Sequence, residues 1–382
     1  MTIGLLKESS DARAALVPET VKKLVSGGHQ VQIESGAGES AFYGDALYTE
    51  AGATVAGRDA ILTGSDVVLA VQPPARAALA QMKPGAAIIA MFNAKFNPAV
   101  AEEIRDLNIL AFSLDQVPRT TIAQTMDVLS SMASMAGYKA VLVAANELPG
   151  YFPMLMTAAG TIPPARVLIL GAGVAGLQAI ATARRLGATV EAFDVRLAAK
   201  EEVESLGAKF VMVEGAAEDA AAGGYAVEQS EEYKQKQREL VHEKALRAQV
   251  VITTAQIPGR KAPLLITRQT VEAMLPGSVI VDLAASTGGN CEVTENDKII
   301  RYGGATIRGK SNLPSQMAQH ASKLFSNNLF SFFQYVFKDG LDKIDFSNQI
   351  PAETCISPFS VPQKEQGTGN KEQGAGGRGQ GT

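Results

Sequence analysis

The chain has 382 residues, of which 46% are hydrophobic and 19% charged, and its formal net charge is −4. This length exceeds what one ordinary hydrophobic core serves, so we expect two domains. The nearly balanced charge gives no overall field that would attract nucleic acid. The two cysteines, Cys291 and Cys355, have no metal-ligand spacing, which predicts no metal site and is typical of a reducing compartment. The N-terminus, "MTIGLLKESS", lacks the basic region and apolar run of a signal peptide.

The N-terminal third of the chain alternates strand and helix patterns. We predict a strand in "TIGLLKE", then a capped helix that returns through a Gly-Gly turn to a second strand in "VPETVKKLVSGGHQVQIE". Short apolar runs in "DVVLAVQPP" and "AAIIAMFNA", and a helix followed by a strand in "EEIRDLNILAFS", continue the alternation. This order predicts a parallel sheet with helices on its faces. A helix from about Thr121 to Glu147 follows, long enough at ~1.5 Å per residue to connect two domains.

A second unit opens at "PPARVLILGAGVAGLQAIATARRLGATVEAFDVR" and continues with strand patterns in "GAKFVMVE", "QVVITTAQ", "SVIVDLA" and "ATIRG". Between them we expect a mobile loop containing Gly223 and Gly224, followed by a charged, solvated helix. The Phe-rich region "LPSQMAQHASKLFSNNLFSFFQYVF" predicts a last amphipathic helix that packs back on the first domain. The fold class is therefore α/β, with two Rossmann-like domains whose parallel sheets are joined by long helices, and a cleft between them.

The domain boundaries follow from this reading. Residues 1–125 with about 325–350 form a discontinuous N-terminal α/β domain, and residues 126–324 form a Rossmann domain with a linking helix. Residues 351–382 are rich in Gly, Gln, Glu and Lys, which predicts a low-complexity tail or linker. The uncharged run Val167–Ala183 imitates a membrane span, but its glycine spacing favours a buried strand, turn and helix. We therefore expect no transmembrane segment in this chain.

The strongest motif is Gly171-x-Gly173-x-x-Gly176, because it follows an apolar strand and opens an Ala-rich helix. In a dinucleotide site the first glycine permits the tight turn, the second lets the backbone approach the pyrophosphate, and the third lets helix and strand pack closely. Val174 and Ala175 lie in the same turn, where the N–H groups of a helix N-terminus favour phosphate.

The strand "TVEAFD" then ends at Asp194, followed by Val195 and Arg196. A carboxylate at this position accepts hydrogen bonds from the adenosine ribose hydroxyls and repels a 2′-phosphate, which favours NAD over NADP. Arg196 leaves that preference open, because an arginine can accommodate a 2′-phosphate.

The expected apparatus for proton transfer is missing from the sequence. A dehydrogenase that oxidises an alcohol or an amine needs a positioned acid or base, and the chain has only three histidines, at positions 29, 242 and 320. We interpret His29 and His242 as surface residues. Hydride transfer directly between two nicotinamides needs no such base; it needs close alignment and exclusion of water. Lys or Asp can also serve as a base, so this absence alone decides little.

Several long blocks resemble one family: "RAALVPETVKKL", "PRTTIAQTMDVLSS", "FPMLMTAAGTIPPARVLILGAGVAGLQAIATARRLGA", "TTAQIPGRKAPLLIT", "PGSVIVDLAASTGGNCE" and "SNLPSQMAQHAS". They are similar to the NAD(H)-binding component of proton-translocating nicotinamide nucleotide transhydrogenases, over roughly Ile3 to Phe337. Alanine dehydrogenases are related, but they carry a substrate-binding Lys where this chain has Gln72 and a catalytic His where it has Asn93. Asp282 matches a position that both groups share.

The resemblance implies roles for polar residues near the start of the linking helix. Arg119, Gln124 and Asp127 would lie beside the nicotinamide as the catalytic group, with Arg119 and Asp127 orienting the ring and Gln124 contacting its ribose or carboxamide. Ser130 and Ser131 would add hydroxyl contacts. An ordinary helix cap with an Arg–Asp pair is the alternative structural explanation.

The resemblance also implies two loops over the nucleotide. Tyr225 matches the tyrosine of a mobile loop that closes over it, with Gly223 and Gly224 as hinges. Ala255, Gln256 and Pro258 in "TTAQIPG" match a second loop beside it.

The function implied is hydride transfer from NADH, bound here, to NADP+ held by a separate NADP(H)-binding component. A membrane-spanning proton-channel component would couple this transfer to proton translocation. The resemblance further implies a homodimer, peripheral on the cytoplasmic side of the inner membrane; the Phe325–Phe337 stripe serves either the dimer contact or, more commonly for such stripes, the core. Two alternatives remain: a stand-alone alanine-dehydrogenase-like amino-acid dehydrogenase, and a non-catalytic NAD-binding module.

Overall fold

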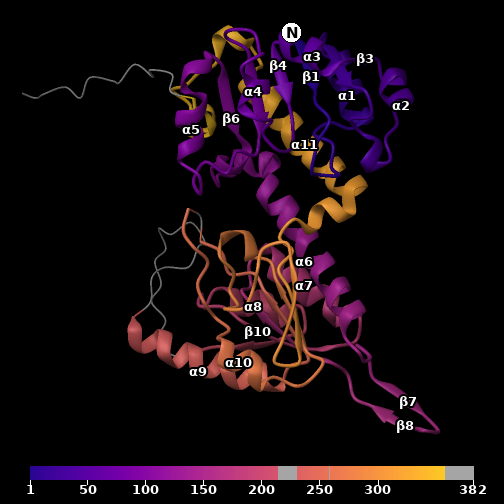
Figure 1. Ribbon diagram of the computed structural model, residues 1–382, viewed down its shortest axis with the longest axis vertical. Helices are drawn as coiled ribbons and strands as arrows, with labels where there is room; N and C mark the ends of the chain where they lie inside the picture. The colour runs from indigo at the N-terminus through magenta and orange to yellow at the C-terminus, as the bar shows by residue number, and fades with distance from the viewer. Residues whose placement is uncertain (214–229, 258, 358–382) are drawn as a thin grey trace, which may run out of the picture.

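The computed structural model describes residues 1–213, 230–257 and 259–357. These residues form two α/β domains, each built on a parallel sheet, with a long helix running from one domain into the other (Figure 1). The predicted fold class is confirmed in its α/β character and its two parallel, Rossmann-like sheets.

The first domain has a six-stranded sheet in the order β3-β2-β1-β4-β5-β6, and every pair of neighbouring strands is parallel. This is the doubly wound order, with its switch point between β1 and β4. The elements are β1 (Thr2–Leu5), α1 (Pro18–Ser26), β2 (Gln30–Glu34), α2 (Asp45–Glu50), β3 (Thr54–Ala56), α3 (Arg58–Gly64), β4 (Val67–Leu69), α4 (Arg76–Leu79), β5 (Ala87–Ala90), α5 (Ala99–Ile104) and β6 (Leu110–Ser113).

The second domain has a seven-stranded sheet in the order β11-β10-β9-β12-β13-β15-β14, parallel except for the antiparallel pair β14–β15. The six adjacent strands from β11 to β15 in this sheet repeat the doubly wound order, with the switch point between β9 and β12. The elements are β9 (Arg166–Leu170), α7 (Val174–Arg185), β10 (Thr189–Phe193), α8 (Ala199–Ser205), β11 (Lys209–Val211), α9 (Glu231–Arg247), β12 (Val250–Thr253), α10 (Arg268–Ala273), β13 (Val279–Asp282), β14 (Ile299–Tyr302) and β15 (Ala305–Arg308).

Helix α6 (Val128–Glu147) belongs to both hydrophobic cores. Its first turns contribute Met132 and Met135 to the core of the first domain, and its later turns contribute Ala140 and Ala144 to the core of the second. The two cores therefore meet inside α6, several residues beyond the boundary expected at residue 126. Among the described residues, α6 is the one helix whose length and composition would allow it to cross a membrane.

The predicted start of this helix at Thr121 is wrong. A 3-10 helix, η4 (Ile122–Met126), comes first, and Asp127 interrupts the two helices with a non-helical ψ of 87°. The Asp127 carboxylate accepts a hydrogen bond from the backbone N–H of Ser130 at 2.9 Å, so the residue caps α6 instead of continuing a single helix.

Helix α11 (Ala318–Val336) returns to the first domain, as the sequence predicts for the Phe-rich region. The phenylalanines lie in the core of that domain: Phe325, Phe332, Phe333 and Phe337 are each at most 2% exposed. Core packing, and not a dimer contact, therefore accounts for these four residues of the Phe325–Phe337 stripe.

The chain beyond residue 350 differs in part from the predicted low-complexity tail. Helix α12 (Gln349–Thr354) is followed by Cys355, which forms an antiparallel bridge with Phe112 of β6. The backbone N–H of Ile356 then donates to the carbonyl oxygen of Ala111 at 2.8 Å. Residues 351–357 thus cover the edge of the first sheet, and the rest of the expected tail lies outside the described residues.

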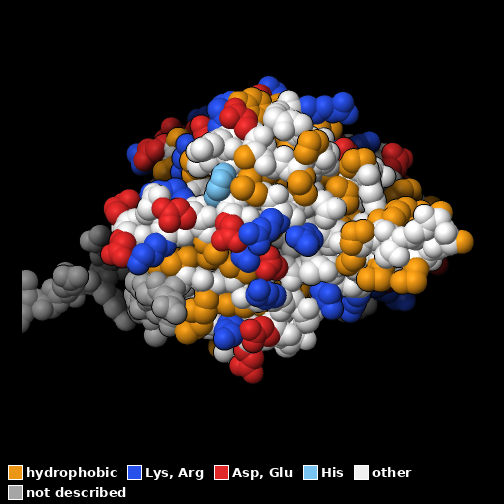
Figure 2. Space-filling view, turned by 90° about the horizontal axis from the view of Figure 1, so that it is seen from below, with side chains coloured by type: hydrophobic (Ala, Val, Ile, Leu, Met, Phe, Trp, Pro, Cys, Tyr) orange, Lys and Arg blue, Asp and Glu red, His pale blue; other side chains and the backbone are white. Residues whose placement is uncertain are grey.

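A hairpin that the sequence did not reveal projects from the second domain (Figure 1). Its strands, β7 (Leu155–Thr157) and β8 (Gly160–Ile162), pair only with each other, and Met156 is 73% exposed. Figure 2 shows hydrophobic side chains gathered over this projection. The segment from 148 to 165 contains no charged residue.

Helices α6 and α7 approach so closely that one contact tolerates no side chain. A Cβ on Gly137 of α6 would overlap the backbone carbonyl oxygen of Ala175 in α7. Ser134, one turn earlier, has its Oγ 3.5 Å from the Oε1 of Gln178 in α7. The first turn of α7 is therefore fixed against α6 backbone to backbone.

This contact predicts that Gly137→Ala destabilises the protein by about 1–3 kcal/mol, because the two helices must separate to admit the methyl group. Gly64→Ala is the matched control: Gly64 is also helical, a Cβ there meets nothing within 4 Å, and alanine favours helix by up to ~1 kcal/mol. Chemical denaturation of both variants measures the difference. Equal stability of the two would show that the helices separate without cost.

Candidate functional site

The glycine motif forms the turn between β9 and α7. Gly171 has a φ of 104°, which favours glycine, and a Cβ there would lie 2.5 Å from Thr254 Oγ1. A Cβ on Gly176 would overlap the carbonyl oxygen of Gly171. A Cβ on Gly173, by contrast, would meet nothing within 4 Å. The backbone at Gly173 is therefore open to a ligand, while the other two glycines are required by the protein itself.

This turn lies at the switch point of the second sheet, where the ends of β9 and β12 meet. Thr254, directly after β12, donates a hydrogen bond from its Oγ1 to the carbonyl oxygen of Gly171 at 3.0 Å. Val174, the first residue of α7, is 42% exposed, and Ala175 beside it contacts α6. A helix N-terminus exposed at a switch point is where a dinucleotide pyrophosphate binds in this topology.

Asp194 follows β10 and is only 8% exposed. Its Oδ2 accepts from the backbone N–H of Ala172 in the glycine turn at 2.8 Å. Arg196 pairs with both carboxylate oxygens, through Nε at 2.9 Å and Nη2 at 2.8 Å. The hydrogen bond and charge of Asp194 raise the pKa of Arg196 above its ordinary value. Val195, between them, is half-buried.

Ala255 and Gln256 continue from β12 on the same side of the sheet. The Asn290 side chain binds both backbone groups of Ala255: its Oδ1 accepts the Ala255 N–H at 3.1 Å, and its Nδ2 donates to the Ala255 carbonyl at 2.9 Å. Gln256 is exposed, and its Nε2 donates to the carbonyl of Leu283 at 3.1 Å. The predicted site residues Pro258 and Tyr225, with the predicted mobile loop around Tyr225, lie outside the described residues.

Asn290 is a residue that sequence reasoning missed. It is fully buried, and its own N–H donates to Oδ2 of Asp282 at 2.8 Å. Asp282 is also fully buried and accepts Thr253 Oγ1 at 2.9 Å, so the pair ties the loop after β12 to the end of β13. No local pattern in the sequence indicates this role, because the hydrogen-bond partners of Asn290 lie on other segments of the chain.

The polar group before α6 comes from a different element. Arg119 and Gln124 are exposed, and Gln124 belongs to η4. Asp127 caps α6: its Oδ1 accepts the Ser130 N–H, and its Oδ2 accepts Ser130 Oγ at 2.6 Å. Ser131 is half-buried in the same first turn. The helix-cap explanation thus accounts for the position of Asp127, and its contact with a nicotinamide stays a prediction.

Helix α11 holds η4 in place through Asn328, which sequence reasoning also missed. The Asn328 side chain is 8% exposed, and its Nδ2 donates to the carbonyl of Thr125 at 2.8 Å. Thr125 is the immediate neighbour of Gln124, so this bond fixes the backbone that presents Gln124.

The polar group and the glycine turn lie on different domains, and α6 connects them. Asp127 caps its first turn, and Gly137 contacts Ala175 beside the glycine turn. At ~1.5 Å per residue, the two positions are about 15 Å apart along the helix. The length of α6 therefore sets the distance between the polar group before this helix and the glycine turn.

The corresponding switch point of the first sheet is filled by the protein itself. Glu8, after β1, accepts the backbone N–H of Val71 at 2.6 Å and that of Gln72 at 3.2 Å, both after β4. Burial raises the pKa of Glu8 to about 7, against the effect of these bonds.

Asp11 and Arg13 form a buried pair next to this position, with side chains 1% and 3% exposed. Burial opposes ionisation of Asp11, but the hydrogen bonds and charge of Arg13 outweigh it and hold the pKa of Asp11 well below its usual range. Asn312, which follows β15 in the second domain, donates to Asp11 at 3.0 Å. The pair therefore also links the two domains.

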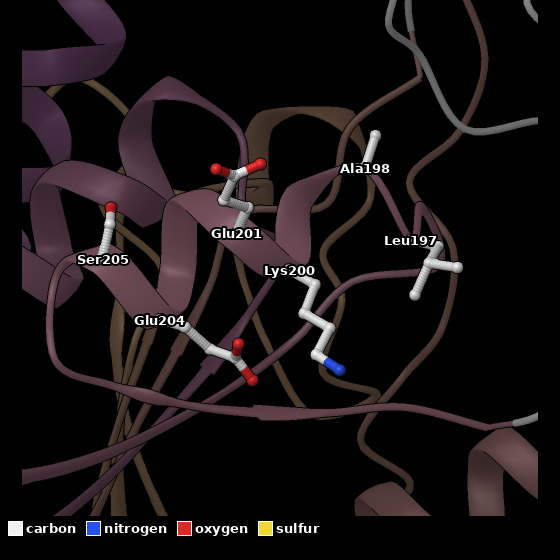
Figure 3. Close-up of a pocket in the computed structure, with 6 residues that line it drawn as sticks. All are labelled: Leu197, Ala198, Lys200, Glu201, Glu204 and Ser205. Atoms are coloured by element: carbon white, nitrogen blue, oxygen red, sulfur yellow. The ribbon is translucent and has the colours of Figure 1, made fainter.

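Two cavities are found among the described residues, and the first is lined in part by Leu197, directly after Arg196. One of about 530 Å³ follows the outer side of α8, with Lys200, Glu201 and Glu204 among its lining residues (Figure 3). Another of about 410 Å³ lies between Leu110 and the segment around Phe346. Neither is lined by the glycine turn or the residues before α6, and the predicted cleft between the domains stays a prediction.

Comparison with known proteins identifies the family. The model described as "Alanine dehydrogenase/PNT, N-terminal domain" matches residues 4–136, and the corresponding C-terminal domain model matches residues 140–358. The chain is 48% identical over 369 residues to the first of the parts that make up NAD(P) transhydrogenase subunit alpha in Rhodospirillum rubrum, with 94% of this chain and 96% of that protein covered. The chain belongs to the NAD(P) transhydrogenase subunit alpha family. The predicted resemblance is confirmed.

Other members and relatives agree with this assignment. NAD(P) transhydrogenase subunit alpha of Haemophilus influenzae is 41% identical, with 92% of this chain and 69% of that protein covered. The solved structure of the transhydrogenase from Sinorhizobium meliloti matches with a TM-score of 0.85 and 42% sequence identity. The match covers 94% of this chain and 98% of that chain. Alanine dehydrogenase of Mycobacterium tuberculosis is 29% identical, with 76% of this chain and 74% of that protein covered. The transhydrogenase subunit is thus more similar to this chain than that dehydrogenase is.

The glycine turn of this transhydrogenase family member gives a matched pair of variants. Gly173→Ala adds a methyl group in open space, so we expect unchanged thermal unfolding but NADH binding weakened at least tenfold. Gly176→Ala adds the same group against the Gly171 carbonyl, so we expect it to lower the melting temperature as well. Calorimetry and NADH titration measure both effects. Normal NADH binding by Gly173→Ala would show that the pyrophosphate does not approach there.

Proposed function

We propose that this subunit binds NAD(H) at the glycine turn of the second domain and transfers hydride from NADH to NADP+ on a separate NADP(H)-binding component. The observation that carries the proposal is the open backbone at Gly173, at a switch point where the other two glycines are closely packed. Asp194 beside this turn supplies a carboxylate for the adenosine ribose. The names of the relatives supply the reaction class.

In this proposal the nicotinamide supplies the hydride, and the chain binds and orients it. Val174 and Ala175 offer the N–H groups of a helix N-terminus to the pyrophosphate. Ala255 and Gln256, with Pro258 and Tyr225, would flank the nucleotide. Their role is to keep water from the reacting ring, since hydride transfer depends on close, dry approach.

The group Arg119, Gln124 and Asp127, with Ser130 and Ser131, would orient the nicotinamide. Gln124 is exposed on a 3-10 turn that Asn328 anchors, so it can meet both the ring held here and a second nucleotide from outside. The direct transfer needs no proton to be moved at this point.

Two of the three histidines of the chain make side-chain contacts that engage them within the protein. The His29 ring packs edge-on against Phe333, with ring centroids 5.2 Å apart. His242, on α9, has its Nδ1 2.9 Å from Oγ1 of Thr270 in α10, and His320 is exposed on α11. His29 and His242 contact residues outside the glycine turn and outside the start of α6, whereas His320 lies on α11, the helix that anchors η4 through Asn328.

The stand-alone amino-acid dehydrogenase is disfavoured by the first domain. Arg13, the cation that could bind a substrate carboxylate there, is already paired with Asp11 and buried. Gln72 and Asn93 replace the Lys and His expected from the resemblance to alanine dehydrogenases. A non-catalytic NAD-binding module remains the second alternative, and a measurement of hydride transfer distinguishes it from the proposed function.

The proposal includes partners that the family names imply only in general terms. We propose a homodimer in which the uncharged β7–β8 hairpin is covered by the second copy, because an isolated two-stranded hairpin is marginally stable in water. A membrane-spanning proton-channel component would couple the reaction to proton translocation and hold this subunit peripherally on the cytoplasmic side of the inner membrane.

The direct test mixes this protein, NADH and a purified NADP(H)-binding component loaded with an NADP+ analogue of shifted absorbance. We expect rapid reduction of the analogue that requires both proteins. We expect no NADH oxidation by this protein alone with pyruvate and ammonia. Sustained turnover with pyruvate would favour the amino-acid dehydrogenase, and NADH binding without transfer would favour the non-catalytic module.

Gln124→Ala tests the alignment role. We expect hydride transfer to slow at least tenfold, equivalent to ~1.4 kcal/mol in the barrier, while the NADH dissociation constant changes less than twofold. The matched control is Thr125→Ala, which removes a neighbouring exposed side chain of η4 and keeps the carbonyl that Asn328 binds. Lost NADH affinity with normal transfer at saturation would contradict the role.

A further inference from the structure

The carboxylate of Asp194 has all of its acceptor positions engaged. Oδ1 accepts the Arg196 backbone N–H at 2.8 Å and Arg196 Nε at 2.9 Å. Oδ2 accepts the Ala172 backbone N–H and Arg196 Nη2, both at 2.8 Å. A carboxylate offers about four lone-pair positions, so none is left for another donor.

These four donors are of two kinds. The N–H groups of Ala172 and Arg196 belong to the backbone of the turns after β9 and β10 and remain while those turns hold. The other two donors belong to one guanidinium, and their number equals that of the hydroxyls on an adenosine ribose. If the ribose binds Asp194 through both hydroxyls, it needs the two positions that the guanidinium holds.

We propose that the Arg196 guanidinium is an internal competitor of the nucleotide, holding the two ribose-binding positions of Asp194 in the empty protein and releasing them when NAD(H) binds. This inference rests on the proposed function, because it assumes that Asp194 receives the ribose. It makes Arg196 a residue that sets the affinity for NAD(H) and takes no part in hydride transfer.

Burial and charge favour this exchange. The Asp194 side chain is 7% exposed and needs donors in the empty site, since a buried carboxylate without partners is costly. The Arg196 side chain is 29% exposed, and rotation about its side-chain bonds withdraws it without moving the backbone. The negative charge of Glu202, on α8, also acts on Arg196 and contributes to raising the pKa of Arg196.

The opposite arrangement has Arg196 staying in place and contacting the nucleotide itself. The two arrangements predict opposite signs. Removal of an internal competitor strengthens nucleotide binding, whereas removal of a direct contact weakens it.

Arg196→Met tests the sign, because methionine keeps an unbranched apolar stem and removes the guanidinium donors. We expect the NADH dissociation constant to fall three- to tenfold, measured by calorimetric titration. We also expect the melting temperature of the ligand-free protein to fall while that of the NADH-saturated protein stays near wild type, since only the empty state loses the pair. Arg185→Met, on the last turn of α7, is the control for loss of one positive charge and should change neither quantity.

Weaker or unchanged NADH binding by Arg196→Met would overturn the inference. If that variant does not fold, Arg196→Lys carries the test: lysine keeps the charge without the two-pronged geometry, and a smaller increase in affinity is expected, with no increase contradicting the inference. Failure of the proposed function is distinguishable, because wild-type protein would then not bind NADH at all.

Discussion

The arrangement of the whole molecule depends on one helix that belongs to two cores. The first turns of α6 pack in the first domain and its later turns in the second, so neither domain can rotate freely without disturbing the packing of this helix. The contact of Gly137 with the Ala175 carbonyl removes the remaining freedom at the start of α7. The distance between the cap at Asp127 and the contact of Gly137 with α7 is thereby set by the rise of the helix, ~1.5 Å per residue.

The two sheets have the same strand order, yet their switch points differ chemically. In the second domain, the turn at Gly173 leaves backbone exposed to a ligand. In the first domain, the equivalent position is closed by the carboxylate of Glu8, which takes the N–H groups of Val71 and Gln72. An internal carboxylate there satisfies the donors that an external anion would otherwise bind. Topology thus provides the position in both domains, and local residues decide which one accepts a nucleotide.

Patterns that are local in sequence predicted the corresponding structure well. The β9–α7–β10 unit, the charged helix α9 and the amphipathic helix α11 all carry their own periodicity or glycine spacing. The break at Asp127 does not, because one side-chain bond to Ser130 decides it. The β7–β8 hairpin has no core-facing period to recognise, and Cys355 pairs with Phe112, on a strand more than 200 residues earlier in the chain. The anchors Asn290 and Asn328 were missed for the same reason, since their partners are distant in the chain.

The carboxylates around the proposed site share one property that bears on the chemistry. Asp127 is engaged by the N–H and hydroxyl of Ser130, and Asp194 by Ala172 and Arg196. The four acceptor positions of Asp194 are all taken, so it would have to release a donor before it could accept a proton from a substrate, whereas the two donors of Ser130 occupy only part of the acceptor capacity of Asp127. A base needs a lone pair directed at the reacting group, whereas a carboxylate whose positions are filled by the protein fixes the geometry of its surroundings. The charged residues at the entrance of α6 and at the end of β10 therefore fix the backbone around them, and in the proposed function this supplies the alignment that transfer between two nicotinamides would require.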